Sequence, residues 1–212
     1  MNDTYRIKEV APFAGQLSVT VESTDGAFEK HIVAKEFFKP LGIEEGDLIG
    51  DEELFSLSHA SDLTVAVTKA LDALSYSSMS RHALTDKLRF KYKFTRSLAE
   101  EAADYAVKRH YIDEESQAKR IADVSVRTKF WGRRRIAAYL VSKGYPADVA
   151  DDAAGSIKGE EYRTALSKII DKKAGCSLDE AEYKKLVSSL IRLGHDPSDV
   201  KAVLSEKSDD RD

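Results

Sequence analysis

The sequence predicts a mainly α-helical protein in which three tandem three-helix repeats form an elongated, curved array, preceded by a small N-terminal module that contains a β-hairpin. Three observations predict this class. Residues 5–33 show the alternation and turn signals of short strands, the chain after about Ser61 shows only helical periodicity, and a helix-start pattern recurs at a fixed interval. We therefore expect a module over 1–60 and repeats over 61–111, 112–158 and 159–212.

The N-terminal module is predicted to hold three strands, near 5–10, 16–21 and 28–33. Turn-forming residues separate them: the segment 11–15 supplies the first turn, and Asp25-Gly26 gives the signal of a tight hairpin, because glycine adopts positive φ at no steric cost. A short helix near 34–39 closes the module. Since three strands alone are marginally stable, we expect the sheet to pack on that helix or on the start of the helical region.

The helical region shows apolar residues at intervals of three and four, which is the pattern of amphipathic helices. Thr95 is placed as an N-cap, and Arg109 suits the negative, C-terminal end of the same helix. The predicted helices lie near 62–75, 81–92, 95–109, 114–127, 131–143, 146–155, 160–173, 179–193 and 197–206.

A repeat of 51 residues is visible in the helix starts Thr95-x-x-Leu98, Pro146-x-x-Val149 and Pro197-x-x-Val200. Leu88, Tyr139 and Leu190 precede these starts at the same interval, and Gly144 and Gly194 suit left-handed positions that end the preceding helices. Stacked repeats bury their apolar faces against neighbours and form long concave surfaces. A single irregular helical bundle without repeats is the alternative.

Charge is unevenly distributed, although the net charge is only −4. Residues 81–145 hold 16 basic and 8 acidic groups, whereas residues 1–80 hold 6 and 14, and residues 146–212 hold 11 and 15. A basic middle attracts a polyanion or an acidic protein surface. Solvated lysines and arginines on outward helix faces would give the same count, so both interpretations remain open.

Catalytic and metal-binding patterns are missing from the sequence. It has no glycine-rich phosphate loop and no G-x-S-x-G motif, its five histidines lie singly, and Cys176 has no second cysteine to pair with. We therefore expect no catalytic residue, metal or cofactor, and a filler role for Cys176 in a turn. Because no long apolar stretch, apolar leader or coiled-coil heptad is present, we expect a cytoplasmic monomer that does not contact a membrane.

One segment, Lys129 to Leu140, resists a purely structural explanation. Its three arginines fall in the first turn of a helix, where the partial positive charge of the exposed N–H groups makes each cation cost about 0.3–1 kcal/mol. A phosphate or carboxylate docked there would reverse that cost. The candidate contact residues are Lys129, Trp131, Arg133, Arg134 and Arg135. In the alternative, the arginines pair with internal acids such as Asp113 and Glu114, and Trp131 fills the junction between repeats.

A second basic run, 87–96, interleaves cations with aromatic residues, a mixture that suits stacking and phosphate contact. At helical spacing, however, its apolar positions favour the core and its cations favour a solvated rim. Lys91 and Lys93 are therefore lesser candidates.

The order and spacing of these segments resemble the RecX family. The middle repeat matches through Tyr111-Ile112-Asp113-Glu114-Glu115 with Ala118, Gly132-Arg133-Arg134-Arg135-Ile136, and Leu140-Val141-Ser142-Lys143-Gly144. The first repeat is similar through Ala70-Leu71, Leu74-Ser75, Ser80, Leu84 and Lys87-Leu88, whereas Ser77, Met79 and Ala83 stand where the family often has Arg, Arg and Glu. The third repeat matches mainly in its pattern, and the strand-containing start resembles an extension found in some members.

The resemblance implies a non-enzymatic regulator of the RecA recombinase that acts in DNA repair. Such a protein would lie along the groove of the RecA filament, made of protein and single-stranded DNA, and would suppress strand exchange, ATP hydrolysis and RecA-promoted repressor cleavage. Two other hypotheses remain: a helical protein that binds DNA directly through phosphate contacts, and a scaffold for an unrelated protein.

Overall fold

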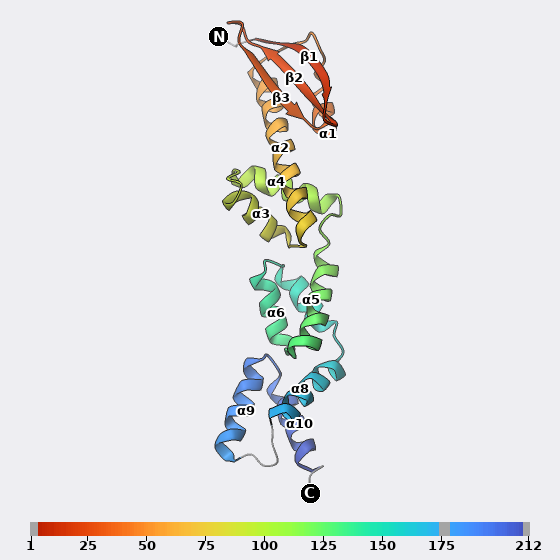
Figure 1. The fold of residues 1–212 in the computed structure, drawn as a ribbon, viewed down its shortest axis with the longest axis vertical. Helices are drawn as coiled ribbons and strands as arrows, with labels where there is room; N and C mark the ends of the chain where they lie inside the picture. The colour runs from red at the N-terminus through yellow and green to blue at the C-terminus, as the bar shows by residue number, and fades with distance from the viewer. Residues whose placement is uncertain (1–3, 174–178, 210–212) are drawn as a thin grey trace. The chain divides into compact units, whose positions relative to one another are not determined.

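A computed structural model of the chain describes residues 4–173 and 179–209, so Cys176 lies outside the described residues (Figure 1). The chain forms two compact units. The first comprises Met1–Ser77 and Leu84–Tyr111, and the second comprises Ser78–Ala83 and Ile112–Asp212. None of the helices in the described ranges combines the length and apolar composition needed to cross a membrane.

The sheet of the first unit has four antiparallel strands in the order β3-β2-β1-β4. They are β1 Tyr5–Phe13, β2 Gln16–Glu22, β3 Phe28–Val33 and β4 Leu48–Ile49. The three predicted strands and the hairpin turn, with Gly26 at φ 82°, are confirmed. The first turn is tighter than predicted: β1 continues through Phe13, and only Ala14 and Gly15 form the turn, both at positive φ.

The helices of this unit are α1 Lys35–Phe38, a 3-10 turn Lys39–Leu41, α2 Asp51–Tyr76, α3 Arg81–Phe90 and α4 Arg96–Lys108. The first three residues of α3, 81–83, are assigned to the second unit, and the rest of this helix belongs to the first. Helix α2 is longer than the predicted 62–75 because an acidic first turn favours a helix start at Asp51 and the Glu53 carboxylate accepts the Gly50 N–H at 2.9 Å. Leu57 and Ala60 are buried with the apolar face of the sheet. Helix α2 therefore covers the sheet, as Figure 1 shows.

A polar contact joins α1 to α4. The Glu36 carboxylate accepts a hydrogen bond from the Tyr105 hydroxyl at 2.7 Å and forms an ion pair with Arg109. The hydrogen bond from Tyr105, followed by the pairing with Arg109, lowers the pKa of Glu36. At the other end of α4, the Thr95 side chain accepts the Leu98 N–H, which confirms the predicted N-cap.

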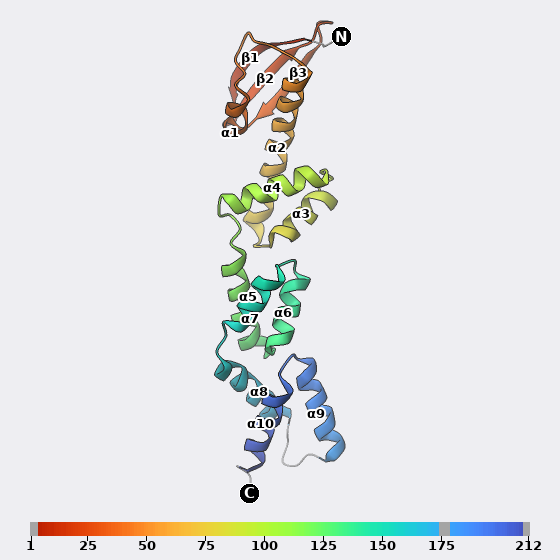
Figure 2. The same ribbon diagram turned by 180° about the vertical axis from the view of Figure 1, so that it is seen from behind.

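The second unit holds α5 Glu114–Lys129, α6 Arg133–Ser142, α7 Ala147–Gly155, α8 Gly159–Lys173, α9 Glu180–Arg192 and α10 Pro197–Asp209. Helices α5 to α7, here the second helical group, enclose one apolar core that includes Ile136 and Leu140. Helices α8 to α10, here the third helical group, are labelled in Figure 2. They enclose another apolar core, which includes Leu166 and Leu190. Phe130 packs against both cores. In both units, helices α3 to α10 each start within two residues of the predicted position, whereas α2 starts earlier.

Left-handed glycines end α6 and α9 as predicted, with φ 82° at Gly144 and 88° at Gly194. The residue after each glycine donates its N–H back into the helix, from Tyr145 to Leu140 O at 3.2 Å and from His195 to Leu190 O at 3.3 Å. The counterpart of Leu190 is thus Leu140, which is fully buried. The predicted match of Tyr139 with Leu190 is wrong, because the turns at Gly144 and Gly194 lie 50 residues apart and the prediction used an interval of 51.

Candidate interaction site at the start of α6

The arginine-rich first turn of α6 follows a sharp change in chain direction. Helix α5 ends at Lys129, and the next residue, Phe130, caps it with a left-handed φ of 54° and donates its N–H to Ser125 O. Gly132 is the N-cap of α6 in an extended conformation, and it offers no side chain to cap the helix. The unpaired N–H groups of the first turn must therefore find their acceptors elsewhere.

Those acceptors come from the third helical group. The elbow between α9 and α10, Leu193–His195, presents two backbone carbonyls to α6: Gly132 N–H donates to Leu193 O at 2.9 Å, and Arg134 N–H donates to Gly194 O at 3.2 Å. The negative, C-terminal end of α9 thus meets the positive, N-terminal end of α6. The expectation that these N–H groups are open to an external anion is wrong for Gly132 and Arg134, because carbonyls already occupy them.

This junction requires glycine on both sides. A Cβ on Gly132 would lie well under 3.0 Å from the backbone of Gly194 and His195, and a Cβ on Gly194 would overlap with Arg135 in the same way. Gly194 also needs its positive φ, which other residues adopt only with strain. The close approach of the two backbones is what allows the two hydrogen bonds to form.

His195 adds a side-chain contact to the same junction. The residue is 3% exposed, and its Nε2 lies 2.9 Å from the Phe130 carbonyl oxygen. Because a carbonyl only accepts hydrogen bonds, Nε2 carries the proton. Burial lowers the pKa of His195, against the smaller opposing effects of the Phe130 carbonyl and Asp199. The ring is therefore neutral at pH 7 and ties the elbow to the end of α5.

The three arginine side chains are exposed, and none forms an ion pair within the part of the chain that the structure describes. The alternative that they pair with Asp113 and Glu114 does not hold. The Asp113 side chain caps α5 by accepting the Ser116 N–H, and Glu114 accepts the Arg81 N–H at 2.8 Å. The guanidinium groups at the start of α6 are thus available to a partner.

Each arginine nevertheless has a defined neighbourhood. The Arg133 guanidinium lies against Gly155 at the C-terminal end of α7, and Arg135 donates from Nη1 to the Arg192 carbonyl at 3.3 Å, at the end of α9. Arg134 lies near Asp196, whose pKa is lowered first by hydrogen bonds from Ser198 and further by this arginine. The carbonyl end of α9 thus holds Arg135, and Arg133 lies beside the C-terminal end of α7.

Trp131 organises the remaining candidates into a cation–aromatic cluster of Lys129, Trp131, Arg135 and Tyr139. The Trp131 ring is half-buried and meets Tyr139 edge to face, with centroids 5.1 Å apart. Lys129 Nζ lies 4.4 Å from the centre of Trp131, and the Arg135 guanidinium carbon lies 4.7 Å from it. Trp131 also packs against the apolar core of the second helical group.

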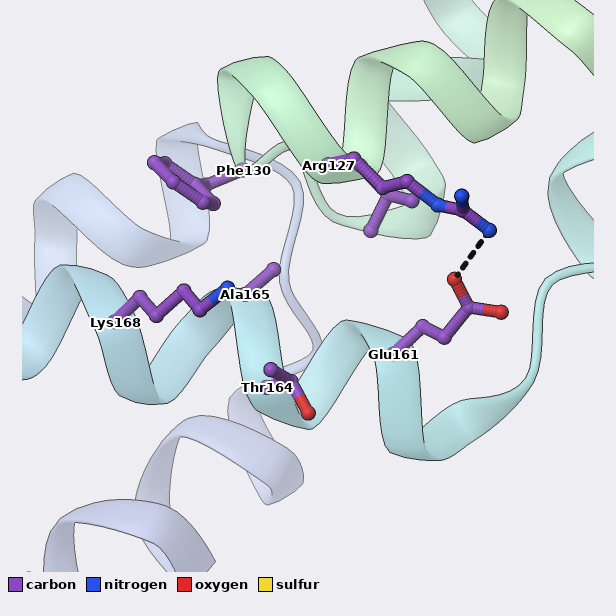
Figure 3. A pocket seen from close by; sticks show the side chains of 7 residues that line it. Arg127, Phe130, Glu161, Thr164, Ala165 and Lys168 are labelled. Carbon is purple, nitrogen blue, oxygen red and sulfur yellow. Dashed lines mark ion pairs between the residues drawn. The ribbon is translucent and has the colours of Figure 1, made fainter.

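Two surface cavities flank this junction. One, of about 440 Å³, is lined by Arg133, Arg134, Gly155, Ile157, Gly159, Tyr162, Gly194, His195, Asp196 and Asp199. Burial raises the pKa of Tyr162 to about 12, so its hydroxyl stays protonated and donates to Ala154 O at 2.7 Å. The other, of about 280 Å³, lies between α5 and α8 beside Phe130, where Arg127 pairs with Glu161 at 3.5 Å (Figure 3).

Lys91 and Lys93 belong to the first unit and take no part in this cluster. Both side chains are exposed; Lys91 Nζ lies 5.4 Å from the centre of the Tyr92 ring, and Lys93 adopts the left-handed φ of 65° after the end of α3. Sequence reasoning missed Tyr139 and His195. The spacing of Tyr139, four residues after Arg135 and eight after Trp131, is the signal that places it on the same face of α6.

Together these observations define a mainly helical protein with a small N-terminal strand module and an exposed arginine cluster at a junction between helical groups. Among the described residues, no three His, Cys, Asp or Glu side chains are grouped so that they could hold a metal ion.

No protein-family model matches the chain. The regulatory protein RecX of Chlorobium limicola is 34% identical over 129 residues, which are 60% of this chain and 79% of that protein. The regulatory protein RecX of Caldanaerobacter subterraneus is 26% identical over 182 residues, 85% and 89% of the two chains. The chain belongs to the RecX family of regulatory proteins.

Two solved structures share the fold. A crystal structure of regulatory protein RecX aligns with a TM-score of 0.79 at 17% identity, over 95% of this chain and 99% of that one. The crystal structure of RecX from Lactobacillus salivarius aligns with a TM-score of 0.64 at 21% identity, over 69% of this chain and 97% of that one. The first of these structures, which aligns over 95% of this chain, therefore shares the mainly helical fold together with its strand-containing start.

Proposed function

We propose that this protein is a non-enzymatic regulator of RecA that binds the RecA–DNA filament and mostly inhibits its recombinase, ATPase and coprotease activities. Its membership of the RecX family supports this proposal. We assign the contact to the arginine surface, defined as Arg133, Arg134 and Arg135 together with Lys129 and Trp131. Lys91 and Lys93 are lesser contacts in the first unit.

The observation that carries the assignment is the exposure of three guanidinium groups that lack a carboxylate partner among the described residues. Guanidinium groups bind carboxylates and phosphates through paired, charge-assisted hydrogen bonds, and a RecA–DNA filament offers both. Lys129 and Arg135 are already held against the Trp131 ring, so they lose less conformational freedom when a partner binds. Such preorganisation favours a defined contact over a diffuse one.

Regulation of this kind requires binding energy and no chemistry. A ligand shifts an equilibrium between two filament states by the difference between its affinities for them. We also propose that α2–α4, α5–α7 and α8–α10 are three tandem repeats, which would spread the contact over neighbouring RecA protomers. The shared elbow geometry after Leu140 and Leu190 supports the repeat. The same proposal has the protein acting as a cytoplasmic monomer, and sedimentation of the free protein tests its oligomeric state.

A triple variant, Arg133→Ala, Arg134→Ala and Arg135→Ala, tests the assignment through ATP turnover by RecA on single-stranded DNA. We expect half-maximal inhibition to require roughly 3- to 150-fold more of the variant, since three exposed charge contacts of roughly 0.2–1 kcal/mol each are lost together. The matched control is Lys172→Ala, Lys185→Ala and Lys201→Ala, which removes the same charge from exposed positions of the second unit. Unchanged inhibition by a folded arginine variant would contradict the assignment.

A second candidate function, direct binding of DNA without RecA, is favoured by the same three unpaired arginines in one helical turn. It predicts that binding to single-stranded DNA weakens linearly on a log–log plot against salt, with a slope of about −0.7 for each phosphate contact. A flat salt response would exclude it.

A further inference from the structure

The first turn of α6 is capped by a distant part of the chain. Gly132 has no side chain to serve as an N-cap, and Leu193, which accepts its N–H, lies 61 positions later in the sequence. The second acceptor is the Gly194 carbonyl, which binds the N–H of Arg134. The conformation of the arginine-rich turn therefore depends on the third helical group.

We propose that the elbow Leu193–His195 is a positioning element for the arginine surface: it holds the first turn of α6 from outside, so that the third helical group is needed for Arg133, Arg134 and Arg135 to engage the partner. This inference rests on the proposed function. It assigns to the elbow a role in binding that requires no contact between the elbow and the partner.

Electrostatics makes such a support necessary. Three cations in a first turn add to the partial positive charge of the helix N-terminus and favour fraying. The elbow opposes this with the carbonyl end of α9, whose Leu193 and Gly194 oxygens occupy two N–H groups of the turn. Without these carbonyls, the turn would lose the helical spacing that sets its guanidinium groups side by side.

Two side-chain contacts extend the support to the cation–aromatic cluster. Arg135 donates to the Arg192 carbonyl at 3.3 Å, and this same guanidinium packs on Trp131. His195 donates to the Phe130 carbonyl at 2.9 Å, one residue before Trp131. Both flanks of Trp131 are thus tied to the segment Arg192–His195, which makes Trp131 a natural reporter of the junction.

Gly194→Ala and His195→Ala are the variants that loosen the elbow. Gly26→Ala is the matched control for the glycine, because Gly26 has nearly the same φ, 82° against 88°, but open space around its Cβ position. His195→Gln is the conservative control, because its amide N–H can also donate to the Phe130 carbonyl. Three readouts follow the variants: emission of Trp131, which is the only tryptophan, exchange of the Arg134 amide hydrogen by NMR, and inhibition of RecA ATP turnover.

We expect Gly194→Ala and His195→Ala to keep their helical circular dichroism, shift the Trp131 emission, speed exchange of the Arg134 amide at least tenfold, and raise the half-inhibitory concentration at least tenfold. His195→Gln should recover most of the inhibition, and Gly26→Ala, although its positive φ strains the hairpin of the first unit, should leave the three readouts as they are in the unsubstituted protein. A merely structural role would speed Arg134 exchange in folded His195→Ala without raising its half-inhibitory concentration.

The inference is overturned if folded His195→Ala shows faster Arg134 exchange yet inhibits RecA as well as the unsubstituted protein, or if Arg134 exchange does not change. Should Gly194→Ala fail to fold, the His195 pair decides alone. Failure of the proposed function is recognised separately, because the Arg133, Arg134 and Arg135 triple variant would then inhibit normally.

Discussion

Gly132→Ala is the substitution that tests the junction between α6 and the elbow most severely. The added Cβ would lie well under 3.0 Å from backbone atoms of Gly194 and His195, so the two segments must separate. Overpacking of this kind costs about 1–3 kcal/mol, and weakening the two backbone hydrogen bonds costs about 1 kcal/mol each, which gives a loss of about 3–5 kcal/mol. The free energy of unfolding of the second unit should fall by this amount.

The assay is thermal unfolding followed by Trp131 emission, because Trp131 lies in the second unit and reports on it alone. For a unit of about 100 residues, each kcal/mol lowers Tm by roughly 4–5 °C, so we expect a decrease of roughly 12–25 °C. Gly159→Ala is the matched control: it lies at the start of α8, has nothing near its Cβ position, and should leave Tm unchanged or slightly higher. A Tm within about 2 °C of the unsubstituted protein for Gly132→Ala would refute the reasoning.

Three further predictions follow from contacts described above. Because burial lowers the pKa of His195 below its ordinary 6.5, the unfolded chain takes up a proton first as pH falls, so the second unit should lose stability below about pH 6.5; His195→Gln should remove this part of the pH dependence in chemical unfolding. Tyr105→Phe should lower the stability of the first unit by about 0.5–1.5 kcal/mol and raise the pKa of Glu36, measured by NMR titration, because its hydroxyl is the largest cause of the lowered pKa. Replacing Arg133, Arg134 and Arg135 by lysine together should retain only part of the inhibition, because lysine keeps the charge but loses the paired donors; inhibition equal to that of the arginines would contradict bidentate recognition.

The helices and glycine turns could be predicted because their signals are local. Amphipathic periodicity, the Thr95 cap and the glycines at 144 and 194 each act within one or two helical turns. Strand β4 has only two residues and leaves no periodic signal, and the first turns of α2, although they begin with a local acidic cap, bury Leu57 and Ala60 under the sheet. Those features are set by tertiary contacts.

In the candidate site, too, some features could be predicted from the sequence and others depend on tertiary contacts. The residue types that carry the positive charge were visible in the sequence, and so was the conflict between three arginines and the dipole of α6. The groups that compensate this positive charge could not be predicted from the sequence, because they are backbone carbonyls, which every residue possesses. An interval of 51 residues matched Tyr139 with Leu190, whereas the helix-ending turns that follow Leu140 and Leu190 lie 50 residues apart.

The central claim, that the arginine surface binds the RecA filament, is tested most directly by the affinity itself. The measurement is co-sedimentation with RecA assembled on single-stranded DNA at one fixed ionic strength. It would compare the unsubstituted protein, the variant with Arg133, Arg134 and Arg135 replaced by alanine, and the control with Lys172, Lys185 and Lys201 replaced by alanine. If each arginine contributes about 1 kcal/mol, the arginine variant should bind about 100-fold more weakly and the control should bind within about twofold of the unsubstituted protein. Equal affinities for the unsubstituted protein and the folded arginine variant would contradict the claim.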